Sequence, residues 1–283
     1  MEHLTGYLKG RGYAVQLAEG VLEQSGYLAG DAQRRAAGVM SMFEDPDVAL
    51  VLPATGGTGA AHLVDLLDYA LIRAHPKVFA GFSNPTALNN SILAAAGLPS
   101  VHGVSGFQFF QAEIDPWTEA AFWATVSGSI AGREVAGHDW HVHRADGLVV
   151  TGPVVGGNLA AFRPLAGTRW MPATSGRILL IEAMNATFED VDDALTHLRL
   201  AGVLDGIAAL LIGAPADWPH VNAPDTDVDE LILRCAGGTF PVVTNVGFGH
   251  QPRRIQFPIG CRVELDTRGE RPVLRYLEDL VRA

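Results

Sequence analysis

Short apolar runs alternate with helical patterns over the first 130 residues of the chain. Unbroken apolar stretches predict buried strands at residues 13–17, at 48–52 and around Val78. Between and after them, the spacing of apolar residues predicts helices at 32–42, 60–69 and 85–96. This alternation of strands and helices is typical of a parallel sheet that is covered by helices on both faces.

The same alternation returns after residue 150. It predicts a helical stretch opening at Gly156, a helix at 191–200, and strands at 177–182, 208–212, 241–246, 262–265 and 273–276. The intervening segment, 131–150, is polar and mixed, and we interpret it as a connection between domains. The predicted fold class is therefore α/β. An N-terminal doubly wound, mostly parallel sheet domain (1–130) is joined by this connection to a smaller C-terminal α/β domain (151–283).

Composition and charge exclude several classes of function. The 283 residues carry a net charge of −11, and the 20 Lys and Arg residues do not cluster, which argues against binding to nucleic acid or to an anionic membrane. The sequence has no apolar run of the ~18 residues that a membrane helix needs, and its start does not resemble a secretory signal. Cys235 and Cys261 are expected to be reduced core thiols. We expect a cytoplasmic protein.

The segment from Val78 to Leu88 predicts a strand, an abrupt turn and a helix, with Ser83 at the turn. Ser and Asn commonly cap helices, and Asn84 before Pro85 fits a cap followed by proline in the first turn. A serine at such a corner is alternatively a nucleophile at the end of a sheet. The nucleophile-elbow pattern is met only in part, because glycine precedes Ser83 by two positions but proline follows it. Taken alone, the segment favours the cap.

Two further polar residues follow predicted strands. Glu182 ends the strand at 177–182, and His250 lies in a glycine-rich loop after the strand at 241–246. Functional groups gather at the carboxyl ends of parallel strands. A serine nucleophile needs a base within hydrogen-bond reach, and the base needs an acceptor that fixes its tautomer. Each residue taken singly is more simply a solvated carboxylate or a loop histidine, but together with Ser83 they supply all three roles.

Two other groups of residues are candidates for binding. The turn Gly56–Gly59 could present backbone N–H groups to an anion or a developing oxyanion, although glycines are also needed for a tight turn with positive φ. It fits neither the P-loop nor the dinucleotide-binding pattern. His138, His141 and His143 form a histidine cluster in the predicted connection, where His141 and His143 would share one face of a strand. We interpret them by default as exposed linker histidines, with metal binding as the alternative.

Several motifs, in the same order along nearly the whole chain, resemble those of the LD-carboxypeptidases and their relatives, the microcin C self-immunity peptidases. They are Gly56–Gly59, Leu63–Tyr69, His75–Lys77, Gly81–Leu88, His102–Gly103, Gly156–Leu159, Gly167–Thr168, Ile181–Glu182, Leu198–Gly206, Gly247–His250 and Pro258–Gly260. The resemblance implies a two-domain α/β fold, a homodimer, and metal-free hydrolysis of an amide bond near a free carboxylate, with no cofactor.

The resemblance also implies roles for particular residues. The serine, glutamate and histidine of the family's triad map onto Ser83 as nucleophile, Glu182 as orienting carboxylate and His250 as base. The backbone N–H groups of Gly57 and Asn84 are the predicted oxyanion hole. The predicted substrate-binding residues are Gly56, Thr58, Trp140 and Asn158, with Trp140 placed to stack on a nucleotide base.

Two substrate classes are consistent with this resemblance: a muropeptide ending in a D-amino acid, and a microcin C-like aminoacyl-nucleotide conjugate. Thr55 stands where the cell-wall enzymes often have arginine, which favours the second class, and Asn84 stands where the family usually has aspartate. The chain also begins where the family's first helix is expected, without the usual first strand. The alternatives are therefore a non-catalytic ligand-binding relative and a metal-dependent hydrolase that uses the histidine cluster.

Overall fold

A single twisted sheet runs through the molecule. The computed structural model describes residues 2–110, 114–144, 147–215 and 227–281. Within them, twelve strands join one sheet whose main path has the order β1-β2-β3-β10-β6-β7-β8-β9-β5. The pairs β3–β10 and β9–β5 are antiparallel, and the other six neighbouring pairs on this path are parallel. The predicted α/β class with a mostly parallel main sheet is confirmed.

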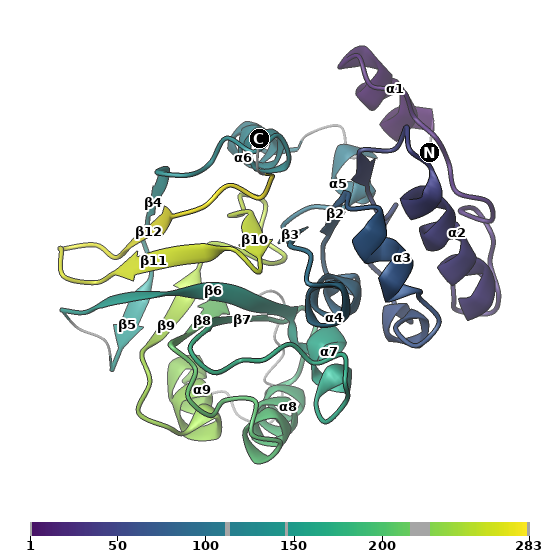
Figure 1. The fold of residues 1–283 in the computed structure, drawn as a ribbon. Coiled ribbons are helices and arrows are strands. Elements are labelled where there is room, and N and C mark those ends of the chain that lie inside the picture. The colour runs from purple at the N-terminus through teal and green to yellow at the C-terminus, as the bar shows by residue number, and fades with distance from the viewer. Residues whose placement is uncertain (1, 111–113, 145–146, 216–226, 282–283) are drawn as a thin grey trace.

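The elements follow one another closely along the chain (Figure 1). The helices are α1 (Glu2–Gly10), α2 (Ala32–Glu44), η1 (Ala60–Leu63), α3 (Tyr69–Ala74), α4 (Thr86–Ala96), α5 (Gly106–Phe110), α6 (Pro116–Val126), α7 (Leu159–Phe162), η2 (Arg163–Leu165), α8 (Phe188–Leu200) and α9 (Val228–Ala236). The strands are β1 (Leu50–Val51), β2 (Val78–Gly81), β3 (Ser100–His102), β4 (Glu134–Ala136), β5 (His141–His143), β6 (Val149–Asn158), β7 (Ile178–Glu182), β8 (Ala209–Gly213), β9 (Val242–Val246), β10 (Phe257–Ile259), β11 (Arg262–Asp266) and β12 (Val273–Tyr276).

Both faces of the central strands are buried. Along β7, Leu179 and Ile181 pack into a large cluster with α2, α4, α8 and α9, whereas Ile178 and Leu180 pack on the opposite face against β11 and β12. Successive side chains of a strand point to opposite faces, so an unbroken apolar strand requires a cover on each side. Figure 1 shows α8 and α9 on one side of β7–β9, with β11 and β12 on the other side of the sheet.

Strand β10 joins the early and late parts of the chain. Phe257 pairs with His102 of β3 in antiparallel register, and Ile259 pairs with Val154 of β6 in parallel register. The sheet is therefore continuous from β1 to β9, and the antiparallel pair β3–β10 reverses its direction, so that β2 and β3 run opposite to β6 and β7.

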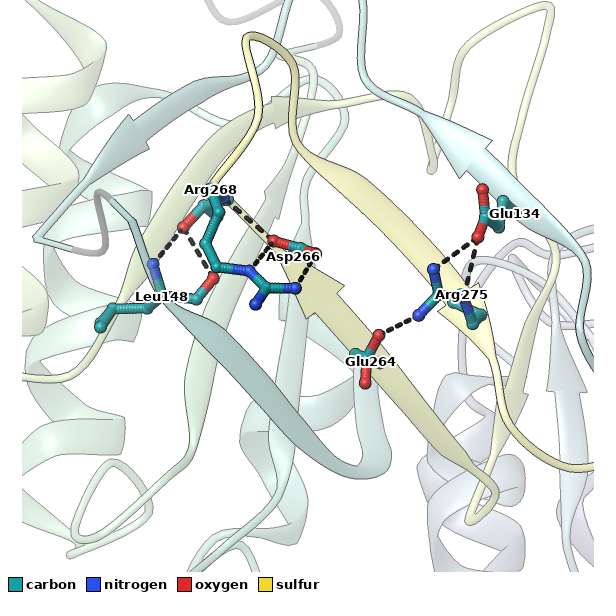
Figure 2. Close-up of polar contacts among 7 residues, drawn as sticks. Glu134, Leu148, Glu264, Asp266, Arg268 and Arg275 are labelled. Atoms are coloured by element: carbon teal, nitrogen blue, oxygen red, sulfur yellow. Dashed lines mark hydrogen bonds and ion pairs between the residues drawn. The ribbon is translucent and has the colours of Figure 1, made fainter.

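Ion pairs support the antiparallel strands near the C-terminus (Figure 2). Arg275 on β12 contacts Glu134 on β4 at 2.6 Å and also pairs with Glu264 on β11. Arg268 pairs with Asp266 at 2.7 Å at the turn that follows β11. Exposed pairs of this kind contribute little individually, about 0–1 kcal/mol each, so their main effect here is to favour the observed register of β4, β12 and β11.

Four sequence predictions of local structure need correction. Residues 13–17 form no strand, because their side chains are largely exposed and Tyr13 instead stacks on Trp123 of α6 at 5.1 Å. The predicted helix at 60–69 is the short η1, and α3 begins only at Tyr69, where Asp68 caps it by accepting from two backbone N–H groups. Gly156 belongs to β6, and the helix there begins at Leu159.

The fourth correction is an addition. The predicted connection contains β4 and β5, which join the sheet through β12 and β9, and from the sequence only a strand through His141 and His143 was considered there. Residues 145 and 146 of this segment lie outside the described residues. The division into two domains stays a prediction. In the described part of the chain, no helix combines the length and the apolar character needed to cross a membrane.

Candidate active site

Ser83 lies at a sharp corner between β2 and α4. Its φ is +65°, in the left-handed region that costs a non-glycine residue about 1–2 kcal/mol. Gly81 makes this corner possible, because a Cβ at position 81 would lie 2.6 Å from Cβ of Pro85. Pro85 is the residue before the first helical position, and no side chain caps α4 by a hydrogen bond, since the side chain of Asn84 instead accepts from the backbone N–H of Ala60. The expected cap at Asn84, with Pro85 as the first helical residue, is therefore wrong, and Ser83 is not a cap either.

The three predicted catalytic side chains meet, and each of them ends or follows a strand of the main sheet. Oγ of Ser83 lies 3.2 Å from Nε2 of His250, and Nδ1 of His250 lies 2.7 Å from Oε2 of Glu182. Ser83 comes from the end of β2, Glu182 from the end of β7, and His250 from the loop after β9. Residues that are 68 and 167 positions apart in sequence thus form one chain of polar contacts.

Glu182 is almost completely buried, with 1% of its surface exposed. Two glycines pack directly against it, because a Cβ on Gly213 or on Gly249 would lie within 2.9 Å of the Glu182 side chain. Burial by itself would raise the pKa of Glu182. The hydrogen bond and charge of His250, together with a 3.0 Å hydrogen bond from Nδ2 of Asn158 to Oε1, outweigh burial and hold the pKa below its usual value.

The ionised state of Glu182 fixes the tautomer of His250. A carboxylate can only accept hydrogen bonds, so Nδ1 of His250 carries the proton and donates it to Oε2. Nε2 then has a free lone pair that accepts from the hydroxyl of Ser83. The histidine is half-buried, with 16% of its side chain exposed, which leaves one side of the imidazole within reach of solvent. This arrangement can remove a proton from Ser83.

The glycine turn lies directly against the serine. A Cβ on Gly56 would lie 2.9 Å from Cβ and 3.1 Å from Oγ of Ser83. The side chain of Asn84 accepts a 2.6 Å hydrogen bond from the backbone N–H of Ala60, which ties the turn to the corner. Among the described residues, the backbone N–H groups of Gly57 and Asn84 have no protein acceptor. Both N–H groups are therefore without a protein partner in the described part of the chain, and their role as oxyanion donors stays a prediction.

The other predicted substrate-binding residues have different surroundings. Thr58 is exposed at the tip of the turn. The side chain of Asn158 contacts Glu182 and also caps α7 by accepting from Ala161. Trp140 packs against Gly137 and the cluster beneath β11 and β12. No described contact joins Trp140 to Ser83, Glu182 or His250, so its role in substrate binding stays a prediction.

Three residues beside the triad were not assigned a role from the sequence. His102 is completely buried, and burial lowers the pKa of its imidazole to about 4, so it is neutral at physiological pH. Thr86 lies 3.4 Å from Nδ1 of His102 and accepts from the backbone N–H of Asn158 at 3.0 Å. Arg254 lies over the ring of Phe82, and burial lowers its pKa to about 10.

A signal for two of these residues was present in the sequence. His102 and Thr86 both belong to motifs on which the family resemblance rests. In the structure, a Cβ on Gly157 would lie within 2.8 Å of a polar atom of each side chain. Arg254 had no such signal, since one of two adjacent arginines in a loop is usually exposed. The backbone of Gly157 therefore lies where the side chains of His102 and Thr86 converge.

The histidine cluster is split by the fold. His138 contacts Arg271 at 3.1 Å, whereas His141 and His143 lie beside Asp229 at the start of α9. None of these residues contacts Ser83, Glu182 or His250 in the described part of the chain. These side chains and the triad therefore form two separate groups.

Known proteins resemble the chain over most of its length. The sequence matches two family models, described as LD-carboxypeptidase N-terminal domain over residues 1–103 and LD-carboxypeptidase C-terminal domain over residues 151–265. A Streptomyces coelicolor protein named as a carboxypeptidase is 34% identical over 248 residues, which cover 85% of this chain and 76% of the relative.

Two solved structures have the same fold. Muramoyltetrapeptide carboxypeptidase from Oxalobacter formigenes superimposes with a TM-score of 0.87 at 26% identity, covering 98% of this chain and 94% of its own. Microcin C7 self immunity protein MccF in complex with aspartyl sulfamoyl adenosine superimposes with a TM-score of 0.89 at 21% identity, covering 99% and 91%. On the strength of the two family models, which together match most of its length, the chain belongs to the LD-carboxypeptidase family of serine peptidases.

Proposed function

We propose that this protein hydrolyses amide bonds with Ser83 as nucleophile, His250 as general base and Glu182 as orienting carboxylate. The observation that carries the proposal is the unbroken series of contacts from Ser83 Oγ through His250 to Glu182, at 3.2 and 2.7 Å. A serine hydroxyl is a weak nucleophile unless an adjacent base takes its proton.

The first step is the attack of Ser83 Oγ on the substrate carbonyl. Its proton passes to Nε2 of His250, and the imidazolium that forms is stabilised by the buried carboxylate of Glu182. His250 then donates this proton to the leaving amine, which gives an acyl-enzyme on Ser83. A water molecule, deprotonated by the same Nε2, hydrolyses the ester and returns the hydroxyl to Ser83.

The negative charge on the carbonyl oxygen needs donors during both steps. We assign this role to the backbone N–H groups of Gly57 and Asn84, which have no protein acceptor among the described residues and follow Gly56 and Ser83, two residues in close contact. Removal of one such donor typically costs about 100- to 1000-fold in rate. Because Asn84 contributes through its backbone, its replacement of the family's usual aspartate is compatible with catalysis.

The substrate belongs to one of two classes that the relatives suggest. One is a muropeptide that ends in a D-amino acid, and the other is an aminoacyl sulfamoyl nucleotide such as the one bound in the MccF structure. Each presents an amide or amide-like bond near an acidic group. A direct competition between the two classes, measured as kcat/KM, assigns the specificity.

Ser83→Ala tests the triad. We expect at least about a 1000-fold loss of kcat on whichever substrate is cleaved, because the nucleophile is removed, with little change in the free energy of unfolding. A fluorophosphonate probe should label the wild-type protein and not the variant. Ser127→Ala, at an exposed serine of the same chain, is the matched control and should keep full activity and labelling. Equal turnover by Ser83→Ala would contradict the assignment, and binding without turnover by the wild type would favour a non-catalytic relative.

A further inference from the structure

Three side chains on the far side of β9 from the triad converge in a way that the proposed reaction does not use. His141 and His143 lie on β5, the last strand of the sheet, and Asp229 lies in the first turn of α9. Residues two apart on a strand point to the same face, so both imidazoles face the helix. One ligand atom from each of the three residues lies within 4.8 Å of the others.

The contacts are directed at a single oxygen. Oδ2 of Asp229 lies 2.8 Å from Nδ1 of His141 and 3.3 Å from Nε2 of His143. The two rings are nearly perpendicular, with an interplanar angle of 86°, so they do not stack on each other and both direct a nitrogen to the carboxylate. Two imidazoles and one carboxylate are the N and O donors that zinc and related transition metals prefer.

We propose that His141, His143 and Asp229 form a binding site for a divalent transition metal of the zinc class. In a tetrahedral zinc site the ligand atoms lie about 3.3 Å apart, given metal–ligand distances of about 2.0–2.2 Å. The observed separations, which run from 2.8 Å to at most 4.8 Å, reach this value with small side-chain rotations. Three protein ligands leave a fourth position for water.

Neighbouring groups contact two of the three residues. Oγ1 of Thr244 on β9 lies 3.2 Å from Nε2 of His143, the same nitrogen that faces Asp229, and an ion would displace this contact. The backbone N–H of Asp229 donates to the cap residue Asp227 at 2.7 Å, which fixes the first turn of α9 and keeps Asp229 in place beside β5.

The site is open to an ion from solvent. The side chains of His141, His143 and Asp229 are 57%, 23% and 24% exposed. His138, in the same segment, differs because it faces the guanidinium of Arg271, which would repel a cation. A bound metal would tie β5 and α9 together next to β9, the strand that leads into the loop of His250.

Zinc titration of the full chain tests the proposal. After treatment with a chelator and dialysis, the wild-type protein should bind one Zn²⁺ per chain in competition with a chromophoric indicator. Co²⁺ should bind with the absorption of a four-coordinate site, and excess Mg²⁺ should not compete, since it prefers oxygen ligands. His143→Ala and Asp229→Asn should each weaken zinc binding at least 100-fold, because each removes one of three protein ligands.

His138→Ala is the matched control, because it removes a histidine of the same segment that is not one of the three proposed ligands. It should bind zinc as the wild type does, and circular dichroism should show every variant folded. The proposal is overturned if wild-type protein binds zinc no more tightly than His143→Ala, or if His138→Ala weakens binding as much as the ligand variants do. Zinc should also raise the thermal unfolding temperature of the wild type and of His138→Ala, but not that of His143→Ala or Asp229→Asn, which would be independent support.

Discussion

At the scale of single residues, the site depends on glycines as much as on charged groups. Gly56, Gly213 and Gly249 each bring backbone so close to Ser83 or Glu182 that a methyl group would collide. Ser83 itself holds a left-handed conformation with φ of +65°, which places its side chain at the exposed edge of the sheet. Strained positions of this kind are common at active sites, where packing of the surroundings maintains them.

Gly56→Ala tests how closely the turn supports the nucleophile. The added Cβ would lie 2.9 Å from Cβ of Ser83, so the serine or the turn has to move. Because a displacement of about 1 Å can cost about 100-fold in rate, we expect kcat to fall by that order while the protein stays folded. Steady-state kinetics and circular dichroism measure the two effects.

Gly6→Ala is the control for this substitution, since nothing lies within 4 Å of a Cβ at that position of α1. It should leave kcat unchanged. An active Gly56→Ala enzyme would show that the turn does not position Ser83.

The sequence predicted the identity of the site residues better than their surroundings. Ser83, Glu182 and His250 were selected because each ends or follows an apolar strand, where functional groups gather in α/β proteins. The structure brings their side chains together although β2 runs opposite to β7 and β9. His102 and Arg254 were not assigned, because nothing local distinguishes a buried polar residue from an exposed one. The partnership of His141 and His143 with Asp229 depends on which helix lies beside β5, and that is a property of the tertiary fold.

At the scale of elements, helix α4 connects the nucleophile to the rest of the site. The side chain of Asn90 donates to the carbonyls of Thr86 and Gly156 and accepts from the backbone N–H of Gly156, all at 2.8–2.9 Å. The two bonds to Gly156 join the helix that follows Ser83 to the strand that ends at Asn158, the hydrogen-bond partner of Glu182, and the bond to Thr86 lies within the helix. Buried polar groups of this kind are costly when they lose their partners.

Asn90→Ala should therefore destabilise the protein strongly. It leaves the N–H and carbonyl of Gly156 buried without these hydrogen bonds, and we expect the free energy of unfolding to fall by about 3 kcal/mol. Urea unfolding followed by circular dichroism provides the measurement. Gln33→Ala, which removes an exposed amide from α2, is the control and should stay within about 0.5 kcal/mol of the wild type. Similar values for the two variants would contradict the role of Asn90.

Elements were predictable where the pattern was long or bounded by caps. Helix α2 and strands β7, β8 and β9 lie where apolar periodicity placed them. The strand predicted at 13–17 failed because an apolar run forms a strand only beside a partner, and the sheet ends at β1 among the described residues. Strand β4 was missed and β5 was considered only through His141 and His143, because these polar segments form strands only beside partners that lie far along the chain.

At the scale of the whole molecule, the neutral buried histidine links stability to pH. The pKa of His102 is about 4 in the folded protein and 6.5 in an unfolded chain, so the unfolded state binds the extra proton between these values. The contribution of His102 to the free energy of unfolding is complete above pH 6.5 and is lost as the pH falls toward 4. The loss is expected to reach about 3 kcal/mol.

His102→Asn should remove this dependence. The difference in free energy of unfolding between the wild type and the variant should shrink between pH 7.5 and pH 4.5, as measured by urea unfolding at several pH values. His75→Asn, at an exposed histidine, should follow the wild-type curve. A difference that stays constant with pH would show that His102 does not titrate in this range.

The place of β10 in the sheet has a consequence for synthesis. Its residue Phe257 pairs with His102, about 155 residues earlier in the chain. At about 5–20 residues per second, a ribosome needs roughly 8–30 s to deliver the partner of β3. Until then the apolar edge of β3 is open to pairing with other chains, a known route to aggregation. We therefore expect the yield of folded protein in cells to depend on the speed of translation and on chaperones that shield this edge.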